Sequence, residues 1–72
     1  MKVWIARDYE GLIAFEEKPV KNYGINPFDE EDFIWRGAKI NSRYEELDEN
    51  MFPEITIINS PVEMEFEIDF NN

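Results

Sequence analysis

The chain has 72 residues, and its 17 Asp and Glu against seven Lys and Arg give a formal net charge of −10 at pH 7. This length fits one domain, 1–72, and the charge disfavours nucleic acid and anionic membranes as partners, because both are bound through Lys and Arg. The absence of Cys and His removes disulfides, thiolate metal ligands and the usual general bases.

The first predicted element is a β-hairpin over residues 2–16. Residues 2–7 are rich in β-forming side chains, and residues 12–16 form the expected return strand. Asp8 stands at the first position of a type I turn, where Asp is favoured, and Gly11 closes the turn with a positive φ.

Residues 20–32 carry turn signals and no clear hydrophobic period. Pro19 is expected to end the return strand before them, because proline cannot donate to a strand ladder. Asn26 and Pro27 fit the start of a single helical turn, and an irregular acidic loop is the alternative.

Three further strands are predicted in the second half of the chain. The first covers residues 33–40, with a bulge at Gly37. The others cover 54–58 and 62–70, and the turn residues 59–61 separate them.

Ser42 and Glu45 have the spacing of a capping box, which predicts at most one helical turn over residues 44–47. About five short strands with turn signals between them indicate a mainly β fold. We therefore predict a small antiparallel sheet, curled or barrel-like, with at most one or two short helical turns.

Residues 62–70 alternate apolar and acidic side chains without a break. On a strand, alternation places the two sets on opposite faces, with successive members of a set about 6.6–6.8 Å apart. This spacing is of the same order as that of phosphates along a nucleic-acid strand, so the acidic set predicts a surface for a phosphate-binding protein. The alternative is a solvent face whose charges protect a sheet edge from aggregation. The acidic set is Glu63, Glu65, Glu67 and Asp69.

A second acidic run is expected to assist that surface or to form a solvated loop, and it consists of Asp29, Glu30, Glu31 and Asp32. The run lacks the alternating oxygen spacing and central Gly of an EF-hand loop, so neither a metal site nor a cofactor is predicted. A protein that binds a hard cation or a small ligand is a third alternative. Arg7, Lys18 or Arg43 across the ladder is expected to offset repulsion along the carboxylate row.

No catalytic site is predicted. Ser42 and Ser60 have no His to activate them, and the three glycines stand apart rather than in a phosphate-binding loop. We therefore expect a protein that is not an enzyme. Its large aromatic side chains are expected to build the core rather than a base-stacking platform, and the main ones are Trp4, Phe15, Phe33, Trp35, Phe52 and Phe66.

Charged residues interrupt the first eight positions before any long apolar region forms, and no later run reaches the length of a membrane span. We therefore expect a cytoplasmic location.

The two ends of the chain carry a distinctive pattern. Its parts are Trp4-Ile5-Ala6-Arg7-Asp8, Gly11-Leu12, Lys18-Pro19, Phe52-Pro53-Glu54-Ile55-Thr56, Asn59-Ser60-Pro61 and Val62-Glu63. This pattern resembles a group of small proteins encoded by phages and prophages of gut bacteria, in particular Bacteroides-like hosts. Met51 stands where the group has Leu, and residues 20–45 match nothing in the pattern.

The resemblance implies a genomic setting in mobile elements and no defined activity, since the group has none assigned. Small acidic phage proteins without catalytic residues include inhibitors of bacterial defence systems, such as anti-CRISPR and anti-restriction proteins. We therefore predict an accessory protein that binds a basic surface of a host or phage protein and mimics nucleic acid. The alternative is a structural or packaging accessory, or a homo-oligomer such as a homodimer, whose acidity serves only solubility.

Overall fold

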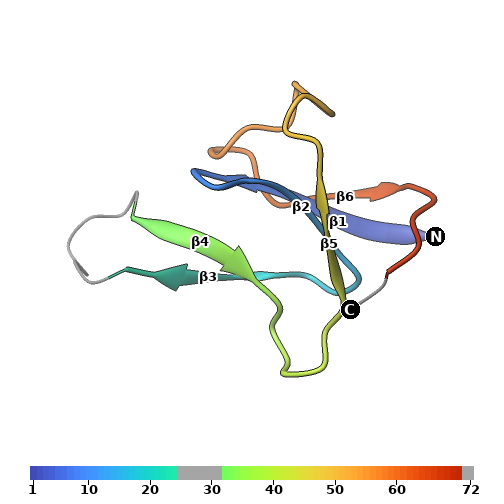
Figure 1. Ribbon diagram of the computed structural model, residues 1–72, viewed down its shortest axis with the longest axis horizontal. Coiled ribbons are helices and arrows are strands. Elements are labelled where there is room, and N and C mark those ends of the chain that lie inside the picture. The colour runs from blue at the N-terminus through green and yellow to red at the C-terminus, as the bar shows by residue number, and fades with distance from the viewer. Residues whose placement is uncertain (25–31, 71–72) are drawn as a thin grey trace.

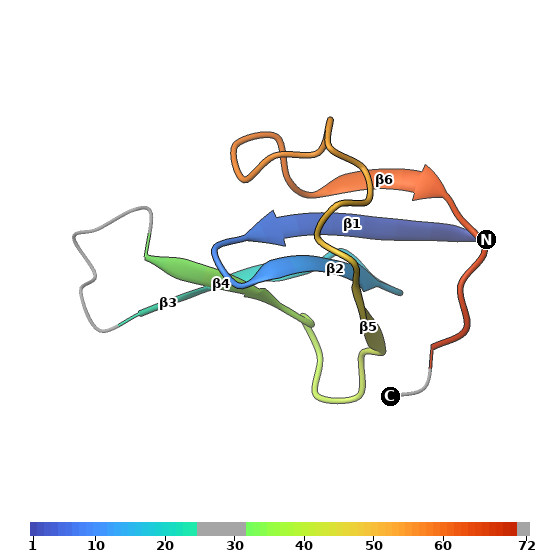
Figure 2. The ribbon, with the colours of Figure 1, turned by 45° about the horizontal axis from the view of Figure 1, so that its top comes forward.

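The computed structural model describes residues 1–24 and 32–70, and this part of the chain is all β. Its strands are β1 Lys2–Asp8, β2 Gly11–Phe15, β3 Val20–Tyr23, β4 Phe33–Arg36, β5 Tyr44–Leu47 and β6 Val62–Glu65. One antiparallel sheet has the order β5-β2-β1-β6, and β3 and β4 form a hairpin that projects to one side of it (Figures 1 and 2). The predicted antiparallel β fold is confirmed, and its four-stranded sheet is open rather than closed into a barrel.

The β1–β2 hairpin forms as the sequence predicts, with a register that runs from Trp4↔Phe15 to Asp8↔Gly11. Asp8 Oδ1 accepts hydrogen bonds from the backbone N–H groups of Glu10, at 2.8 Å, and Gly11, at 3.2 Å. Gly11 has a φ of 144°, which L side chains rarely adopt, so glycine is required at this point of the turn.

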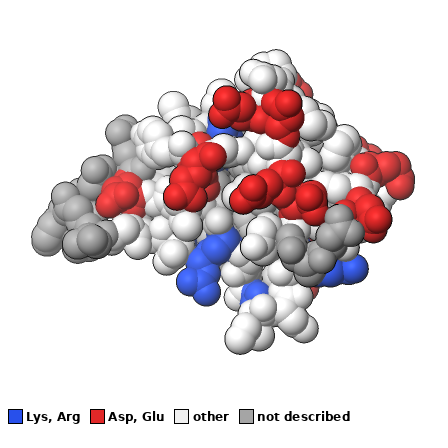
Figure 3. All heavy atoms as spheres, viewed as in Figure 1, with Lys and Arg blue, Asp and Glu red and all other residues white. Residues whose placement is uncertain are grey.

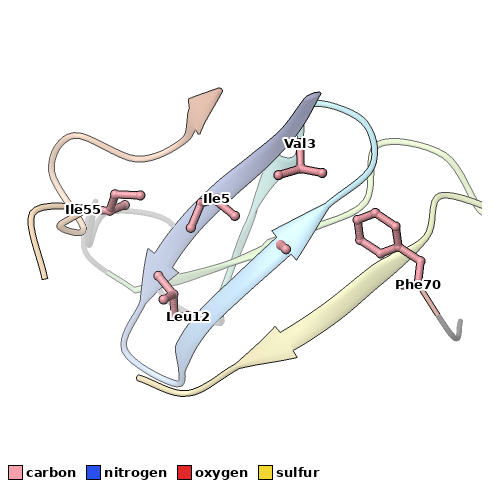
Figure 4. Packing of buried hydrophobic residues seen from close by; sticks show 6 residues of the cluster. Val3, Ile5, Leu12, Ile55 and Phe70 are labelled. Atoms are coloured by element: carbon pink, nitrogen blue, oxygen red, sulfur yellow. The ribbon is translucent and has the colours of Figure 1, made fainter. Parts of the chain in front are cut away.

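The four-stranded sheet is covered on both faces. One face carries a cluster around Val3, Ile5 and Leu12, and Figure 4 shows these side chains between Ile55 at one end and Phe70 at the other. The opposite face carries a second cluster. In it, Phe33 and Trp35 of the β3–β4 hairpin pack against two buried residues of the sheet, Ala6 and Phe15. The six aromatic residues predicted for the core are all buried or half-buried.

The predicted helical turn over residues 44–47 is wrong, because these residues form strand β5. They pair with β2 from Phe15↔Tyr44 to Leu12↔Leu47. The hydroxyl of Ser42 does not cap a helix and instead accepts a hydrogen bond from the backbone N–H of Lys39 at 3.2 Å. Pairing with a neighbouring strand outweighs a short local capping signal.

The predicted strand over residues 54–58 is also wrong, because the chain forms turns there. The side chain of Asn59 accepts from the backbone N–H of Thr56 at 2.7 Å and donates to the carbonyl of Glu54 at 2.9 Å. These local bonds occupy backbone groups that a strand would offer to a neighbour.

The middle of the chain differs from prediction in two respects. Strand β3 lies within a segment predicted to be turn or loop, and it pairs with β4 from Val20↔Arg36 to Tyr23↔Phe33. The predicted strand over 33–40 ends at Arg36, and Gly37 lies in no bulge; a Cβ there would lie 2.8 Å from that of Ser42. The alternative helical turn at Asn26 and Pro27 lies outside the described residues.

Within residues 1–24 and 32–70, no helix is long and apolar enough to cross a membrane.

Candidate protein-binding surface

The predicted acidic strand is shorter than its sequence pattern. Strand β6 pairs with β1 from Ile5↔Val62 to Lys2↔Glu65, and the backbone N–H of Phe66 then donates to the carbonyl of Met1 at 3.0 Å. Strand pairing with β1 stops there. Glu63 and Glu65 therefore remain as the predicted carboxylates that lie on the strand, and both are exposed.

Beyond β6 the apolar and acidic alternation persists without strand pairing. The apolar side chains of Phe66, Ile68 and Phe70 pack on the core, while Glu67 and Asp69 are exposed. This segment runs across the end of the sheet toward β5 (Figure 2). The prediction of one strand over 62–70 is therefore wrong, because β6 ends at Glu65.

The α-amino group of Met1 is the cation nearest to the row. It lies 3.2 Å from a carboxylate oxygen of Glu65 and 3.4 Å from one of Glu67. A hydrogen bond with Glu65, supported by Glu67, raises the pKa of the amino group above its ordinary value of 8.0. Sequence reasoning missed this contact because the register of β1 on β6 was needed to find it.

Within the described residues, the three basic side chains predicted to offset repulsion among these carboxylates form no ion pair with them. Arg7 instead binds the backbone of residues 49–55, on the other side of the sheet. Lys18 Nζ lies 5.5 Å from the ring centroid of Trp4, which is the cross-strand neighbour of Glu63. The guanidinium of Arg43 forms an ion pair with Glu16.

The pKa of the Met1 amino group provides a test of this arrangement. We expect an NMR titration to give a pKa above 8.0, and Glu65→Gln to lower it more than Glu67→Gln does, because Glu65 makes the larger contribution. A raised folded-state pKa adds stability that is present at pH values below 8.0 and is lost as pH rises through the folded pKa. An unchanged pKa in both variants would contradict the contact.

The second predicted acidic run is described at one position. Asp29, Glu30 and Glu31 lie outside the described residues. Asp32 is exposed, its carbonyl accepts from the backbone N–H of Gly24 at 2.8 Å, and its carboxylate lies over Gly24, where an added Cβ would be 2.3 Å from Oδ2. This residue therefore closes the β3–β4 ladder rather than joining the β6 carboxylates.

A further acidic group lies where β5 meets the β1–β2 turn. Glu10, Glu46 and Glu49 line a hollow of about 290 Å³ together with Leu12 and Leu47. Figure 3 shows acidic side chains gathered over the face on which β5 lies in Figure 1, with most of the visible Lys and Arg below them. Sequence reasoning missed this group because Glu10 is far in sequence from Glu46 and Glu49.

Carboxylates placed in this way attract cationic groups. Among residues 1–24 and 32–70, no three acidic side chains are grouped closely enough to hold a metal ion. The hydroxyl of Ser60 accepts a hydrogen bond from the backbone N–H of Arg7 at 2.9 Å and donates to the carbonyl of Thr56, so it holds the loop in place.

No family model, curated protein or solved structure matches the chain.

Proposed function

We propose that this protein is a phage- or prophage-borne accessory that binds a basic, nucleic-acid-binding surface of another protein and thereby inhibits it. The observation that carries the proposal is the placement of exposed carboxylates at both edges of the four-stranded sheet. At the β6 edge they are Glu63 and Glu65, and at the β5 edge they are Glu46 and, in the loop beyond it, Asp48 and Glu49.

Charge complementarity supports this partner over nucleic acid. The net charge of −10 repels phosphates, whereas it steers a basic protein surface toward the carboxylates. The four ion pairs found within the described residues leave Glu46, Glu49 and Glu63 without a cationic partner. These carboxylates can therefore pair with Lys and Arg of a partner without first breaking an internal contact.

The end of β6 at Glu65 means that the acidic surface is not one straight row of carboxylates. A straight row of four carboxylates would copy one phosphate strand, but the chain turns away after β6 (Figure 2). The partner is accordingly expected to meet separate acidic groups at the two edges. The same charges also discourage edge-to-edge pairing of sheets, which is their alternative role.

The test compares two variants that remove equal charge. One carries Glu10→Gln, Glu46→Gln and Glu49→Gln at the β5 edge, and the other carries Glu63→Gln, Glu65→Gln and Glu67→Gln at the β6 edge. Each is used with wild type to capture proteins from a Bacteroides lysate at low and at high salt. Captured proteins are identified, and duplex DNA is then added as a competitor.

We expect wild type to capture a basic nucleic-acid-binding protein that salt and DNA release. At least one triple variant should lose roughly tenfold in affinity, because each exposed pair contributes about 0.2–1 kcal/mol. Unequal losses of affinity in the two variants would show which edge binds the partner. Equal losses would indicate that the negative charge of both edges contributes. Capture that resists salt and DNA, and that both variants retain, would contradict the proposal.

Strand β3 favours the alternative of self-association. All four of its residues are exposed, and β4 is its partner along one edge. An exposed edge strand with Val and Tyr is a template for pairing with a second chain. Sedimentation at two protein concentrations tests this alternative: a homo-oligomer requires a mass that rises with concentration, and Val20→Glu should abolish that rise.

A further inference from the structure

A cleft of about 660 Å³ lies between the β3–β4 hairpin and the loop of residues 53–58. Its volume is within the range of about 300–1,000 Å³ that small-molecule sites occupy. Most of its wall is apolar, and the apolar residues are Phe33, Pro53, Ile55, Ile57 and Ile58. Ile58 is 95% exposed, so it offers a large apolar side chain to any occupant.

The charged side chains described in the cleft wall are cationic, and Tyr9 and Thr56 add neutral polar groups. Arg7 and Lys21 line it, and no Asp or Glu does among the described residues, although the chain has 17 of them. The guanidinium of Arg7 is held by carbonyls of residues 49–55, so this charge is fixed in the wall. The described lining of the cleft therefore has the opposite charge to the protein as a whole.

Lys21 is the cation that is available to a ligand. Its Nζ lies 4.6 Å from the ring centroid of Phe33 and 5.8 Å from that of Trp35, and it makes no ion pair within the described residues. Cation–π contact holds the ammonium over apolar rings at the cleft wall, where no carboxylate of the described residues pairs with its N–H donors.

An apolar wall beside one open ammonium suits a ligand with an apolar chain and a single negative charge. A carboxylate pairs with one ammonium, whereas a phosphate carries more charge and is best matched by several donors or by the fork of an arginine. The protein's own charge of −10 also disfavours multiply charged anions.

We propose that this cleft binds a small amphiphilic monocarboxylate, with its apolar chain against Phe33, Ile57 and Ile58 and its carboxylate on Lys21. This site is separate from the acidic protein-binding surface. It is lined by none of the acidic residues that line the hollow at the β5 edge.

The experiment titrates octanoate into the whole protein, with binding followed by calorimetry and by amide NMR shifts. Octanamide and acetate are the reference ligands, because the first lacks the charge and the second lacks the chain. Lys21→Gln is the test variant. Lys18→Gln is its matched control, since Lys18 also lies over a Trp ring, that of Trp4, but does not line the cleft.

We expect saturable binding of one octanoate, with shifts at Lys21, Phe33 and Ile58, and affinity about tenfold above that for octanamide. Lys21→Gln should abolish that preference, and Lys18→Gln should retain it. Equal affinity for octanoate and octanamide, equal losses in both variants, or no saturable binding would overturn the proposal. Binding of acetyl-Ile-Phe through its free carboxylate, with none of octanoate, would also overturn it and assign the cleft to a protein C-terminus.

Discussion

Replacement of Arg7 by Met is expected to lower the free energy of unfolding by about 2–4 kcal/mol. The guanidinium donates from Nε to the carbonyl of Ile55 at 2.6 Å and from Nη1 to that of Glu49 at 2.9 Å. Nη2 donates to the carbonyls of Met51, at 3.0 Å, and Phe52, at 3.2 Å. A methionine of similar length keeps much of the packing and removes all of these donors.

The loss is expected to be large because these carbonyls belong to the loop that covers one face of the sheet. Ile55 is 2% exposed in the core cluster around Val3 and Ile5. Phe52 packs edge-on against Phe66, with 5.2 Å between the ring centroids. Phe52 also has a φ of 48°, a left-handed conformation that costs free energy unless its surroundings hold it. Without Arg7, the carbonyl of Phe52 loses the guanidinium that helps to hold this conformation.

Urea denaturation of Arg7→Met and Arg43→Met measures the effect against a matched control. Arg43 is exposed and its guanidinium pairs with Glu16, so its loss should destabilise the protein much less than the loss of Arg7 does. Amide hydrogen exchange should also accelerate at Ile55 and Ser60, whose N–H groups bond within the loop. Equal destabilisation by the two variants would show that Arg7 does not hold the loop.

Replacement of Asp8 by Asn is expected to cost about 2–3 kcal/mol, even though the two side chains have the same shape. Asp8 is 4% exposed, and its Oδ2 accepts from the backbone N–H of Trp35 at 2.9 Å. Its Oδ1 accepts from the N–H groups of Glu10 and Gly11 in the hairpin turn. The Asn side chain has one acceptor oxygen in place of the two carboxylate oxygens. Its NH₂ group would therefore face a backbone N–H, which is also a donor.

Asp48→Asn is the control for this variant, because Asp48 Oδ1 accepts one backbone hydrogen bond, from Asn50 at 2.8 Å, at an exposed turn. We expect its stability to change by less than about 0.5 kcal/mol. Thermal unfolding gives the difference, and Trp fluorescence reports the release of Trp35, whose indole N–H donates to the carbonyl of Arg7 at 3.0 Å. A stable Asp8→Asn protein with unchanged fluorescence would contradict the role of the carboxylate.

Arg7 and Asp8 are neighbours in sequence, and each holds one wall of the proposed carboxylate cleft. Arg7 fixes the loop that contains Pro53 and Ile55, and Asp8 fixes β4 through Trp35. Alternation along β1 makes this possible, because adjacent side chains of a strand point to opposite faces. We therefore expect both variants to weaken octanoate binding, although neither removes Lys21.

Sequence reasoning located the elements whose signals are local. The turn of the 2–16 hairpin depends on Asp8 and Gly11, which act within a few residues of each other. The alternation over 62–70 correctly indicated which side chains are covered, even beyond the end of β6. Burial of the large aromatics also followed, because a short chain without disulfides needs their apolar area.

The candidate site was only partly predictable. Glu63 and Glu65 lie on a strand as the sequence indicates, but Glu67 and Asp69 lie beyond the point where pairing with β1 stops. Glu10, Glu46 and Glu49 come together only after β5 has paired with β2, so no local pattern marks them. Lys21 was overlooked because turn signals around it concealed a four-residue strand.

The sequence by itself determined the β class, the first hairpin and the two-sided character of the last segment, because turn chemistry and period-two alternation act over neighbouring residues. The tertiary structure alone decided that residues 44–47 are a strand and that 54–58 are a loop. Strand pairing with β2 selected the first of these conformations, and the side-chain donors of Arg7 and Asn59 selected the second. Both conformations depend on partners distant in sequence or on specific side-chain hydrogen bonds. The free energy of these contacts exceeds the weak local preference of four or five residues for any one conformation.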